Sequence, residues 1–244
     1  MAIIIDGKKT SLEINQELKK KIDDLKAKGK KVPGLVTVLV GDNSASEFYV
    51  NSKVKRCVEV GMISKVEKLD SSISESDLLS LIAKYNNDDN YHGILVQLPL
   101  PKHINEDKII ESISPMKDVD GFHPINVGKL MIGIETFFPC TPYGILELLK
   151  RYKIETSGKH VVVVGRSNIV GKPVANMLLQ KKEGANAVVT VCHSAAKDLS
   201  KFTQQADILI AAIGRANYIT ADMVKEDVVI IDVGINRVED ASSD

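Results

Sequence analysis

Three polar side chains, Ser46, Tyr49 and Lys53, are spaced so that one helix would carry them on one face. At about 100° per residue, they fall within roughly 60° of arc. The adjoining arc carries Val50, Val54, Cys57 and Val58. A lysine at the edge of an apolar side loses hydration, which favours its neutral amine and lets it exchange protons near neutral pH. A lysine whose stem lies on apolar surface while its ammonium stays in water fits the same wheel equally well.

Two further polar residues stand where ligands bind in α/β proteins. Gln97 ends the apolar run 92–97, just before Leu98-Pro99-Leu100-Pro101. Ligands of open α/β sheets bind outside the carboxyl ends of the strands, which makes Gln97 a candidate binding residue. Asp120 lies between two blocks of the sequence, where a carboxylate can pair with a protonated ring or amine of a substrate, or can cap a turn.

A glycine-bounded turn, Gly165-Arg-Ser-Asn-Ile-Val-Gly171, follows an apolar strand and precedes a helix. A doubly wound sheet presents helix-terminal N–H groups to a phosphate at such a turn. The spacing is not GxGxxG, so the surrounding strand–turn–helix–strand order carries the prediction of a dinucleotide site. The alternative is a tight turn that binds nothing.

The end of the next strand bears on the choice of cofactor. NAD sites usually have Asp or Glu there to bond the ribose 2′-hydroxyl, whereas this strand ends in Cys192-His193-Ser194. Arg166, with His193 and Ser194, suits a 2′-phosphate, because a guanidinium matches a phosphate dianion. The sequence therefore favours NADP over NAD.

The elements that must position these residues alternate short apolar runs with amphipathic stretches, which is typical of βα units and a mostly parallel sheet. Strands are expected over 35–40, 65–69, 92–97, 160–164, 187–192, 207–212 and 228–233, and the last three are apolar enough to be covered by helices on both faces. Helices are expected over 44–60, 76–85, 141–153 and from the glycine turn to about 182. A capping box at Thr10-Ser-Leu-Glu13 should open the first helix, and Thr141 should cap the helix in which Pro142 takes the first position. The loop-rich stretch 118–136 should connect two domains, residues 1–137 and 138–244.

The composition excludes several classes of protein. A chain of 244 residues with 44% hydrophobic content can form two modest domains. Its 32 basic and 32 acidic residues give no bulk field to attract nucleic acid or an anionic membrane. No apolar run approaches the roughly 20 residues that span a bilayer, and the N-terminus is charged too soon for a signal peptide. Three scattered cysteines indicate reduced thiols in a cytoplasmic protein, and the histidines show no metal-binding spacing.

Five motifs, taken together, resemble the bifunctional methylenetetrahydrofolate dehydrogenase/methenyltetrahydrofolate cyclohydrolase family. They are Ser46-x-x-Tyr49-x-x-x-Lys53, Val96-Gln-Leu-Pro-Leu-Pro101, Lys117-Asp-Val-Asp-Gly121, Gly165-Arg-Ser-Asn-Ile-Val-Gly171 and Asp232-Val-Gly-Ile-Asn-Arg237. The resemblance covers essentially the whole chain. It implies two α/β domains with a folate site in the cleft between them, the C-terminal one a Rossmann-type doubly wound parallel sheet, usually in a homodimer. It also implies NADP-linked oxidation of 5,10-methylenetetrahydrofolate to 5,10-methenyltetrahydrofolate, and hydrolysis of that product to 10-formyltetrahydrofolate.

The resemblance also implies residue roles. Lys53 would handle the protons of hydrolysis, Gln97 would bond and tune Lys53, Tyr49 would pack beside the substrate ring, and Asp120 would bind the pterin. Ser46, Leu98 and Pro99 would complete the substrate site. The residues implied to line the dinucleotide are Gly165, Arg166, Ser167, Ile169, Gly171, His193, Ser194, Gly214 and Ile235. No metal is implied.

Members of the family usually continue past Asn236 with another strand, a Pro-Gly-Gly-Val-Gly-Pro turn and a closing helix, so we expect a domain shortened at its C-terminus. A shortened chain keeps open the alternative of a non-catalytic folate- or dinucleotide-binding fragment. Another two-domain NAD(P) dehydrogenase, such as a shikimate-type enzyme, would not need the set of Ser46, Tyr49 and Lys53. A monofunctional dehydrogenase is disfavoured by Lys53.

Overall fold

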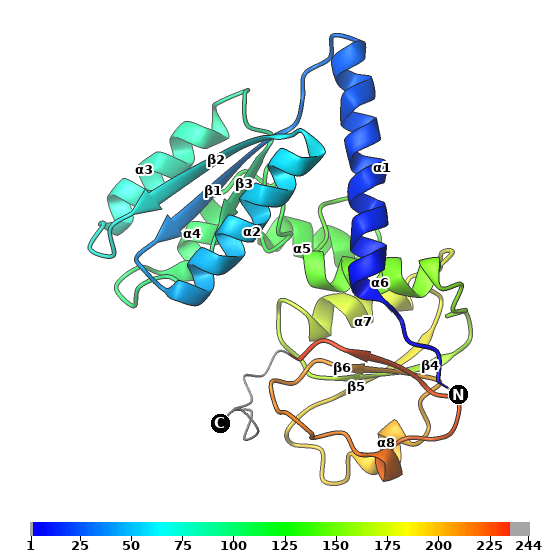
Figure 1. The fold of residues 1–244 in the computed structure, drawn as a ribbon. Helices are drawn as coiled ribbons and strands as arrows, with labels where there is room; N and C mark the ends of the chain where they lie inside the picture. The colour runs from blue at the N-terminus through cyan, green and yellow to red at the C-terminus, as the bar shows by residue number, and fades with distance from the viewer. Residues whose placement is uncertain (1, 235–244) are drawn as a thin grey trace, which may run out of the picture. The chain divides into compact units, whose positions relative to one another are not determined.

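The computed structural model describes residues 2–234, and the chain divides into two compact units, residues 1–126 and 127–244. Each unit has its own parallel sheet (Figure 1). The helix α5 (Pro124–Met131) contains the point of division. Its buried Leu130 belongs to the second unit, where its carbonyl accepts a hydrogen bond from Gln180 Nε2 at 2.6 Å. This contact ties the end of α5 to the second unit.

The first unit contains a three-stranded parallel sheet in the order β2-β1-β3. The strands are β1 (Gly34–Val40), β2 (Ile63–Leu69) and β3 (Gly93–Val96). Leu35 in β1 lies opposite Ser64 on one side and Gly93 on the other. The central strand is almost wholly buried, which explains its continuous apolar sequence.

Helices cover both faces of this sheet. They include α2 (Ser44–Val60), α3 (Glu75–Asn86) and α4 (Glu106–Ser112), whereas α1 (Gly7–Ala27) packs on α2. In Figure 1, α2 lies on one face and α3 on the other. Val36 and Val38 pack with Leu78 and Ile82 of α3 and with Ile109 of α4, forming the core on that side.

The helix that carries the candidate lysine has the predicted bounds. The side chain of Asn43 accepts a hydrogen bond from Ser46 N at 3.0 Å and caps the start of α2. Gly61 ends the helix in the left-handed conformation, with φ of 85°. The prediction for α1 was wrong at its start. Asp6, not the Thr10 box, caps that helix by accepting from Lys9 N at 2.9 Å.

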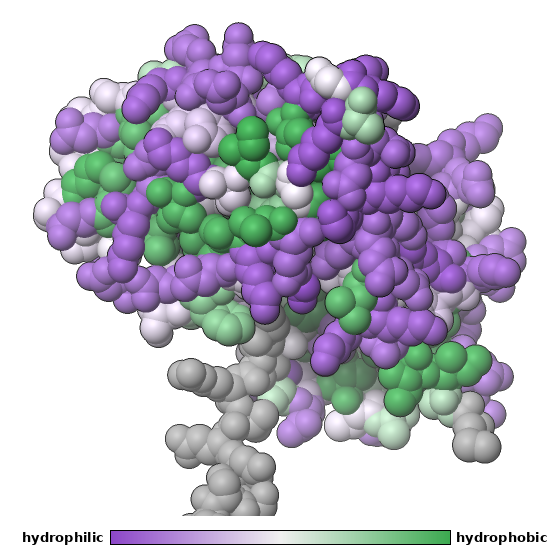
Figure 2. Space-filling model, turned by 45° about the horizontal axis from the view of Figure 1, so that its top comes forward, coloured by the Kyte–Doolittle hydropathy of each residue, from purple (hydrophilic) through white to green (hydrophobic). Residues whose placement is uncertain are grey.

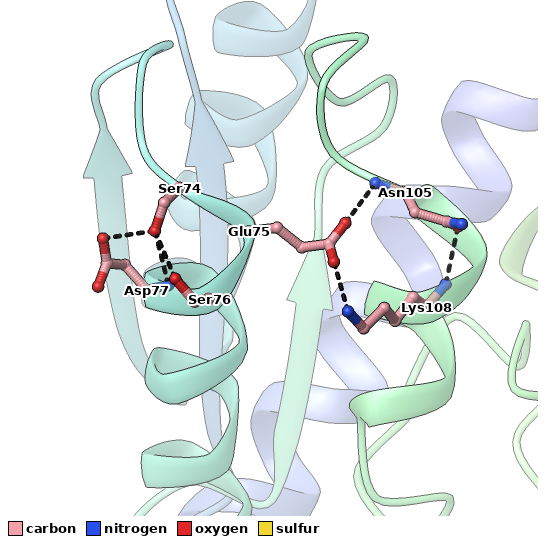
Figure 3. A network of polar contacts seen from close by, with 6 residues as sticks. All are labelled: Ser74, Glu75, Ser76, Asp77, Asn105 and Lys108. Carbon is pink, nitrogen blue, oxygen red and sulfur yellow. Dashed lines mark hydrogen bonds and ion pairs between the residues drawn. The ribbon is translucent and has the colours of Figure 1, made fainter.

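The starts of α3 and α4 are joined by a polar network (Figure 3). Glu75, in the first turn of α3, accepts from Asn105 N at 2.9 Å and from Lys108 Nζ at 2.5 Å. Exposed ion pairs of this kind contribute little free energy, so the network matters mainly for position. It holds the start of α4, where Glu106 Oε1 accepts from Leu100 N at 2.8 Å. The network thereby fixes Leu100 in the Pro-rich segment after β3.

The second unit contains a four-stranded sheet in the order β5-β4-β6-β7, and every pair is parallel. The strands are β4 (His160–Val164), β5 (Val188–Cys192), β6 (Ile208–Ala211) and β7 (Val229–Asp232). This arrangement confirms the predicted α/β class with parallel sheets. β5 and β7 are edge strands, with Val188 61% and Ile230 45% exposed. The prediction that helices cover both faces of these two strands was therefore wrong.

The helical segments of the second unit are α6 (Cys140–Arg151), α7 (Gly171–Leu179), α8 (Ser200–Thr203) and the 3₁₀ turn η1 (Ala221–Met223). The predicted cap of α6 was wrong, because the helix begins at Cys140 with Pro139 at the cap position. Pro142 still falls in the first turn, where a missing N–H costs no intrahelical hydrogen bond.

Candidate active site

In the first unit, α2 and the end of β3 bring Lys53 and Gln97 together. Lys53 Nζ donates a hydrogen bond to Gln97 Oε1 at 3.0 Å. Gln97 Nε2 donates to the Leu98 carbonyl at 2.7 Å, which turns Oε1 toward the lysine. The backbone N–H of Gln97 donates to Val38 O at 2.9 Å, so the backbone of this residue continues the sheet. The half-buried lysine therefore has a fixed partner on a rigid element.

The packing of α2 explains why Lys53 points inward. Val50 and Cys57, one turn on either side of the lysine, are 1% and 9% exposed. The helical wheel was right about these two residues. It was wrong about Val58, which is 64% exposed. The apolar stripe of α2 is thus narrower than the sequence indicated, and Lys53 lies at its edge.

Asp120 reaches the same place through an extended segment beside β3. Ile94 forms a parallel bridge with Asp118, and Ile94 N donates to Lys117 O at 2.8 Å. Gly93 permits this approach, because a Cβ there would lie 2.5 Å from a methyl group of Val119.

The charge of Lys53 acts on the Asp120 carboxyl. Burial raises the pKa of this carboxyl to about 6, against the lowering effect of the Lys53 charge and together with a smaller raising effect of Asp118. The structure therefore gathers Lys53, Gln97 and Asp120 at the carboxyl end of β3, where the strand-end rule places a ligand.

The other predicted substrate residues lie on the same two elements. Tyr49 is 42% exposed, one turn before Lys53 on α2, and its ring meets Phe48 edge-on with centroids 6.0 Å apart. Ser46 is buried in the first turn of α2. Leu98 packs against the core, and the exposed Pro99 follows it through a cis peptide bond. Their roles toward a substrate remain predictions.

In the second unit, the glycine turn has the close packing of a phosphate-binding loop. Gly165 has φ of 134°, and a Cβ there would lie 2.3 Å from the Ala212 carbonyl oxygen. A Cβ on Gly171 would lie 2.2 Å from the Gly165 oxygen. Both positions need glycine, because the loop, the start of α7 and the end of β6 approach so closely. Ser167 Oγ accepts from Val170 N at 3.1 Å and from Gly171 N at 3.3 Å, which shapes the entry to α7.

Two of the predicted cofactor residues meet at the ends of neighbouring strands. Arg166 follows β4 and His193 follows β5, and Arg166 Nη1 lies 3.4 Å from His193 Nε2. An open pocket of about 420 Å³ is lined in part by His193, Lys197 and Lys201. Lys201 Nζ forms an ion pair with Asp198 Oδ2 at 3.5 Å. The balance of charge is positive, and the donors suit a phosphate group.

The remaining predicted cofactor residues lie around this edge. Ser167, Ile169 and Ser194 are exposed, and Gly214 follows β6 in open space. Ile235 lies outside the described residues. A larger hollow of about 680 Å³ opens near the amino ends of β4 and β5, lined by residues such as Lys153. Doubly wound sheets bind nucleotides at the opposite, carboxyl ends, so the smaller pocket is the better cofactor candidate.

Sequence reasoning passed over two residues that hold the site. Glu106 fixes the Pro-rich segment, and Asp118, two residues before Asp120, is buried. Asp118 stood in view as the first acidic residue of Lys117-Asp-Val-Asp-Gly121, but nothing in the pattern shows which carboxylate is buried.

Within residues 2–234, no helix combines the length and the apolar character needed to cross a bilayer. The same residues contain no group of three or more His, Cys, Asp or Glu side chains that could hold a metal ion.

Comparisons with known proteins cover both units. Residues 5–120 match the catalytic domain of tetrahydrofolate dehydrogenase/cyclohydrolase, and residues 139–243 match the NAD(P)-binding domain of the same family. The chain is 59% identical over 243 residues to the bifunctional protein FolD of Chlorobium chlorochromatii, covering 99% of this chain and 82% of that protein.

Solved structures agree with these matches. The bifunctional methylenetetrahydrofolate dehydrogenase/cyclohydrolase FolD from Campylobacter jejuni superposes with a TM-score of 0.93 at 54% identity, covering 97% of this chain and 83% of that one. The Trypanosoma brucei enzyme, complexed with NADP and an inhibitor, gives a TM-score of 0.92 at 34% identity, covering 99% of this chain and 82% of that one. The chain belongs to the tetrahydrofolate dehydrogenase/cyclohydrolase family.

Proposed function

We propose that Lys53, Gln97 and Asp120 form the folate site of a bifunctional one-carbon enzyme. Its two reactions are NADP-dependent oxidation of 5,10-methylenetetrahydrofolate to 5,10-methenyltetrahydrofolate and hydrolysis of that product to 10-formyltetrahydrofolate. The observation that carries this proposal is the bond of 3.0 Å between Lys53 Nζ and Gln97 Oε1, in a chain whose family performs both reactions.

The oxidation needs positioning above all. When bound, NADP would accept a hydride from the one-carbon bridge of the folate. A carboxylate at Asp120 can accept N–H bonds from the pterin ring and its amino group, which orients the bridge. In the second unit, the tight glycine turn before α7 supports a pyrophosphate site there, and the proximity of Arg166 to His193 supports a site for a 2′-phosphate.

The hydrolysis needs a proton carrier. Water attacks the methenyl carbon, and a C–O bond forms as the water gives up a proton. The bond from that carbon to one ring nitrogen then breaks, the nitrogen takes up a proton, and the hydroxyl oxygen forms the C=O bond of the formyl group and releases its own proton to solvent. The amine of Lys53 can accept the proton that the attacking water gives up and deliver it to the nitrogen, while the Gln97 oxygen fixes its position. The net result is addition of water and release of one proton.

Three finer assignments complete the proposal. A homodimer is supported by exposed apolar residues of the first unit, including Val58, Ile63 and Val66, and Figure 2 shows apolar side chains gathered on the surface of that unit. A cytoplasmic location is supported by the reduced cysteines Cys57 and Cys192. NADP is preferred over NAD because of Arg166.

The test compares Lys53→Met with Lys55→Met, an exposed lysine on the same helix. Reduced nicotinamide is followed with methylenetetrahydrofolate and either NADP or NAD, and hydrolysis is followed by the loss of the methenyl compound. We expect Lys53→Met to slow hydrolysis by about 100-fold or more, the usual contribution of a general acid–base group, and Lys55→Met to leave it unchanged. Equal hydrolysis in both variants would remove Lys53 from this role. Binding of folate and NADP without turnover by the unaltered chain would favour a non-catalytic binding fragment.

A further inference from the structure

Asp118 is a buried carboxylate beside the folate site, and the proposed reactions do not use it. Asp118 is only 2% exposed, and in the sequence it lies between β3 and the start of α5. Charged side chains are seldom buried so completely unless they are hydrogen-bonded. Its contacts therefore indicate what it does.

The backbone of Asp118 anchors the turn that carries Asp120. On one side, Asp118 forms the parallel bridge to Ile94 of β3. On the other, its carbonyl accepts from Gly121 N at 3.2 Å, and Gly121 takes φ of 67°. Asp120 is thus the third residue of a turn whose first residue is fixed to the sheet.

The side chain of Asp118 fixes the segment that follows this turn. Its Oδ2 accepts from His123 N and from Asn126 Nδ2, both at 2.8 Å. Asn126, which is 1% exposed, also donates to Pro115 O at 2.9 Å. A carboxylate that accepts two N–H bonds at the start of α5 holds that helix end much as a cap does. Asp118 therefore joins β3, the turn and α5.

We propose that Asp118 is a positioning residue of the folate site, which holds the turn that presents Asp120 and acts on that carboxylate through its negative charge; this inference rests on the proposed function. The charged groups that act on Asp120 in the described part of the chain are Lys53, from α2, and Asp118, from its own segment. Lys53 favours the ionised carboxylate and Asp118 opposes it, and burial opposes it most strongly. Asp118 consequently helps to set the pH at which Asp120 becomes able to accept N–H bonds from a pterin.

The test separates the charge of Asp118 from its hydrogen bonds. In Asp118→Asn, the amide oxygen can accept both existing bonds, so the geometry is kept and the charge is lost. In Asn126→Ala, the charge is kept and one bond is lost. Each variant is assayed for kcat/KM with methylenetetrahydrofolate across the acid range, and the Asp120 carboxyl is titrated by ¹³C NMR without substrate.

We expect Asp118→Asn to move both the acid limb and the Asp120 titration to lower pH, by about half a unit. We expect Asn126→Ala to leave the acid limb in place and raise KM about fivefold, as the loss of one hydrogen bond should. A purely structural Asp118 would lower activity in Asp118→Asn with no movement of either titration, and that result would overturn the proposal. If Asp118→Asn does not fold, Asn126→Ala decides the matter, since an unchanged KM there also overturns it.

A further variant tells failure of this inference from failure of the proposed function. Asp120→Asn should raise KM for the folate strongly if Asp120 binds the pterin. An unchanged KM would refute the proposed role of Asp120, whereas the NMR titration in Asp118→Asn would still report whether Asp118 acts on it.

Discussion

Replacing Asp120 with asparagine should stabilise the protein at neutral pH while it weakens folate binding. Burial raises the pKa of this carboxyl from its ordinary value of 3.8 to about 6. The folded chain therefore holds the proton more tightly than the unfolded chain does. The corresponding stability is fully present below about pH 3.8 and is lost as the pH rises through about 6. Above that range, the folded protein carries an unfavourably placed charge.

The size of the effect follows from the two pKa values. They differ by roughly two units, and each unit corresponds to about 1.4 kcal/mol, which gives an upper value of about 3 kcal/mol at neutral pH. Near pH 5, the destabilising free energy of the Asp120 charge is about half of its value at neutral pH. Local relaxation and water would reduce the gain, so we expect Asp120→Asn to raise the free energy of unfolding by about 1–3 kcal/mol at neutral pH.

The assay is urea unfolding followed by circular dichroism, analysed for the transition of residues 1–126. Asp89→Asn is the matched control, because Asp89 is an exposed aspartate of the same unit, in the loop before β3. The advantage of Asp120→Asn should grow as the pH rises from about 5 to above 7, and Asp89→Asn should show no such growth. A variant less stable than the parent at neutral pH, or an advantage that shrinks as the pH rises, would refute the reasoning.

Three other substitutions test the rest of the site. Gly165→Ala should lower the thermal unfolding temperature of the second unit and weaken NADP binding, because φ is 134° and the new Cβ would meet a carbonyl oxygen at 2.3 Å. The control Gly214→Ala, where the new Cβ meets no neighbouring atom, should leave the unfolding temperature unchanged. Equal shifts of the unfolding temperature in the two variants would contradict this prediction. Gln97→Leu removes the acceptor of the Lys53 ammonium, so methenyl hydrolysis should fall about 10- to 100-fold, and a rate within twofold of the parent would count against the contact. Arg166→Gln should raise KM for NADP about tenfold or more with little change for NAD, and parallel changes for both cofactors would exclude a 2′-phosphate contact.

The regular elements were largely predictable because their signals are local. Strands of five or so apolar residues, such as 160–164, can be read directly, and β4 has the predicted bounds. The start of α1 was missed because two polar residues compete for it, and the earlier one, Asp6, caps the helix. The helices α4 and α5 went unpredicted, because seven or eight residues are too few to show a period of 3.6. Helix α5 occupies part of a stretch that was expected to be loop.

The candidate site was predictable in its members but not in its geometry. The spacing on α2 placed Lys53 at the edge of the apolar face, yet it fitted a solvated ammonium equally well. Only the structure shows that the Gln97 amide is held by the Leu98 carbonyl, which leaves its oxygen to face the lysine. The burial of Asp118 depends on the bridge to Ile94, a contact between residues distant in sequence that no local pattern reports.

Parallel pairing explains why both units collect their functional residues at strand ends. In the first unit, β1 leads into α2 and so to Lys53, while β3, paired beside β1, is followed directly by Gln97. In the second unit, β4 leads into the glycine turn, and β5, paired beside it, is followed directly by His193. Because parallel strands point the same way, every connection that follows a strand begins at one edge, and residues more than 25 positions apart become neighbours. A shift of one residue in the register of β1 against β3 would move Gln97 away from Lys53 without altering either local sequence. The chemistry therefore depends on the buried strand pairing as much as on the polar side chains that the pairing assembles.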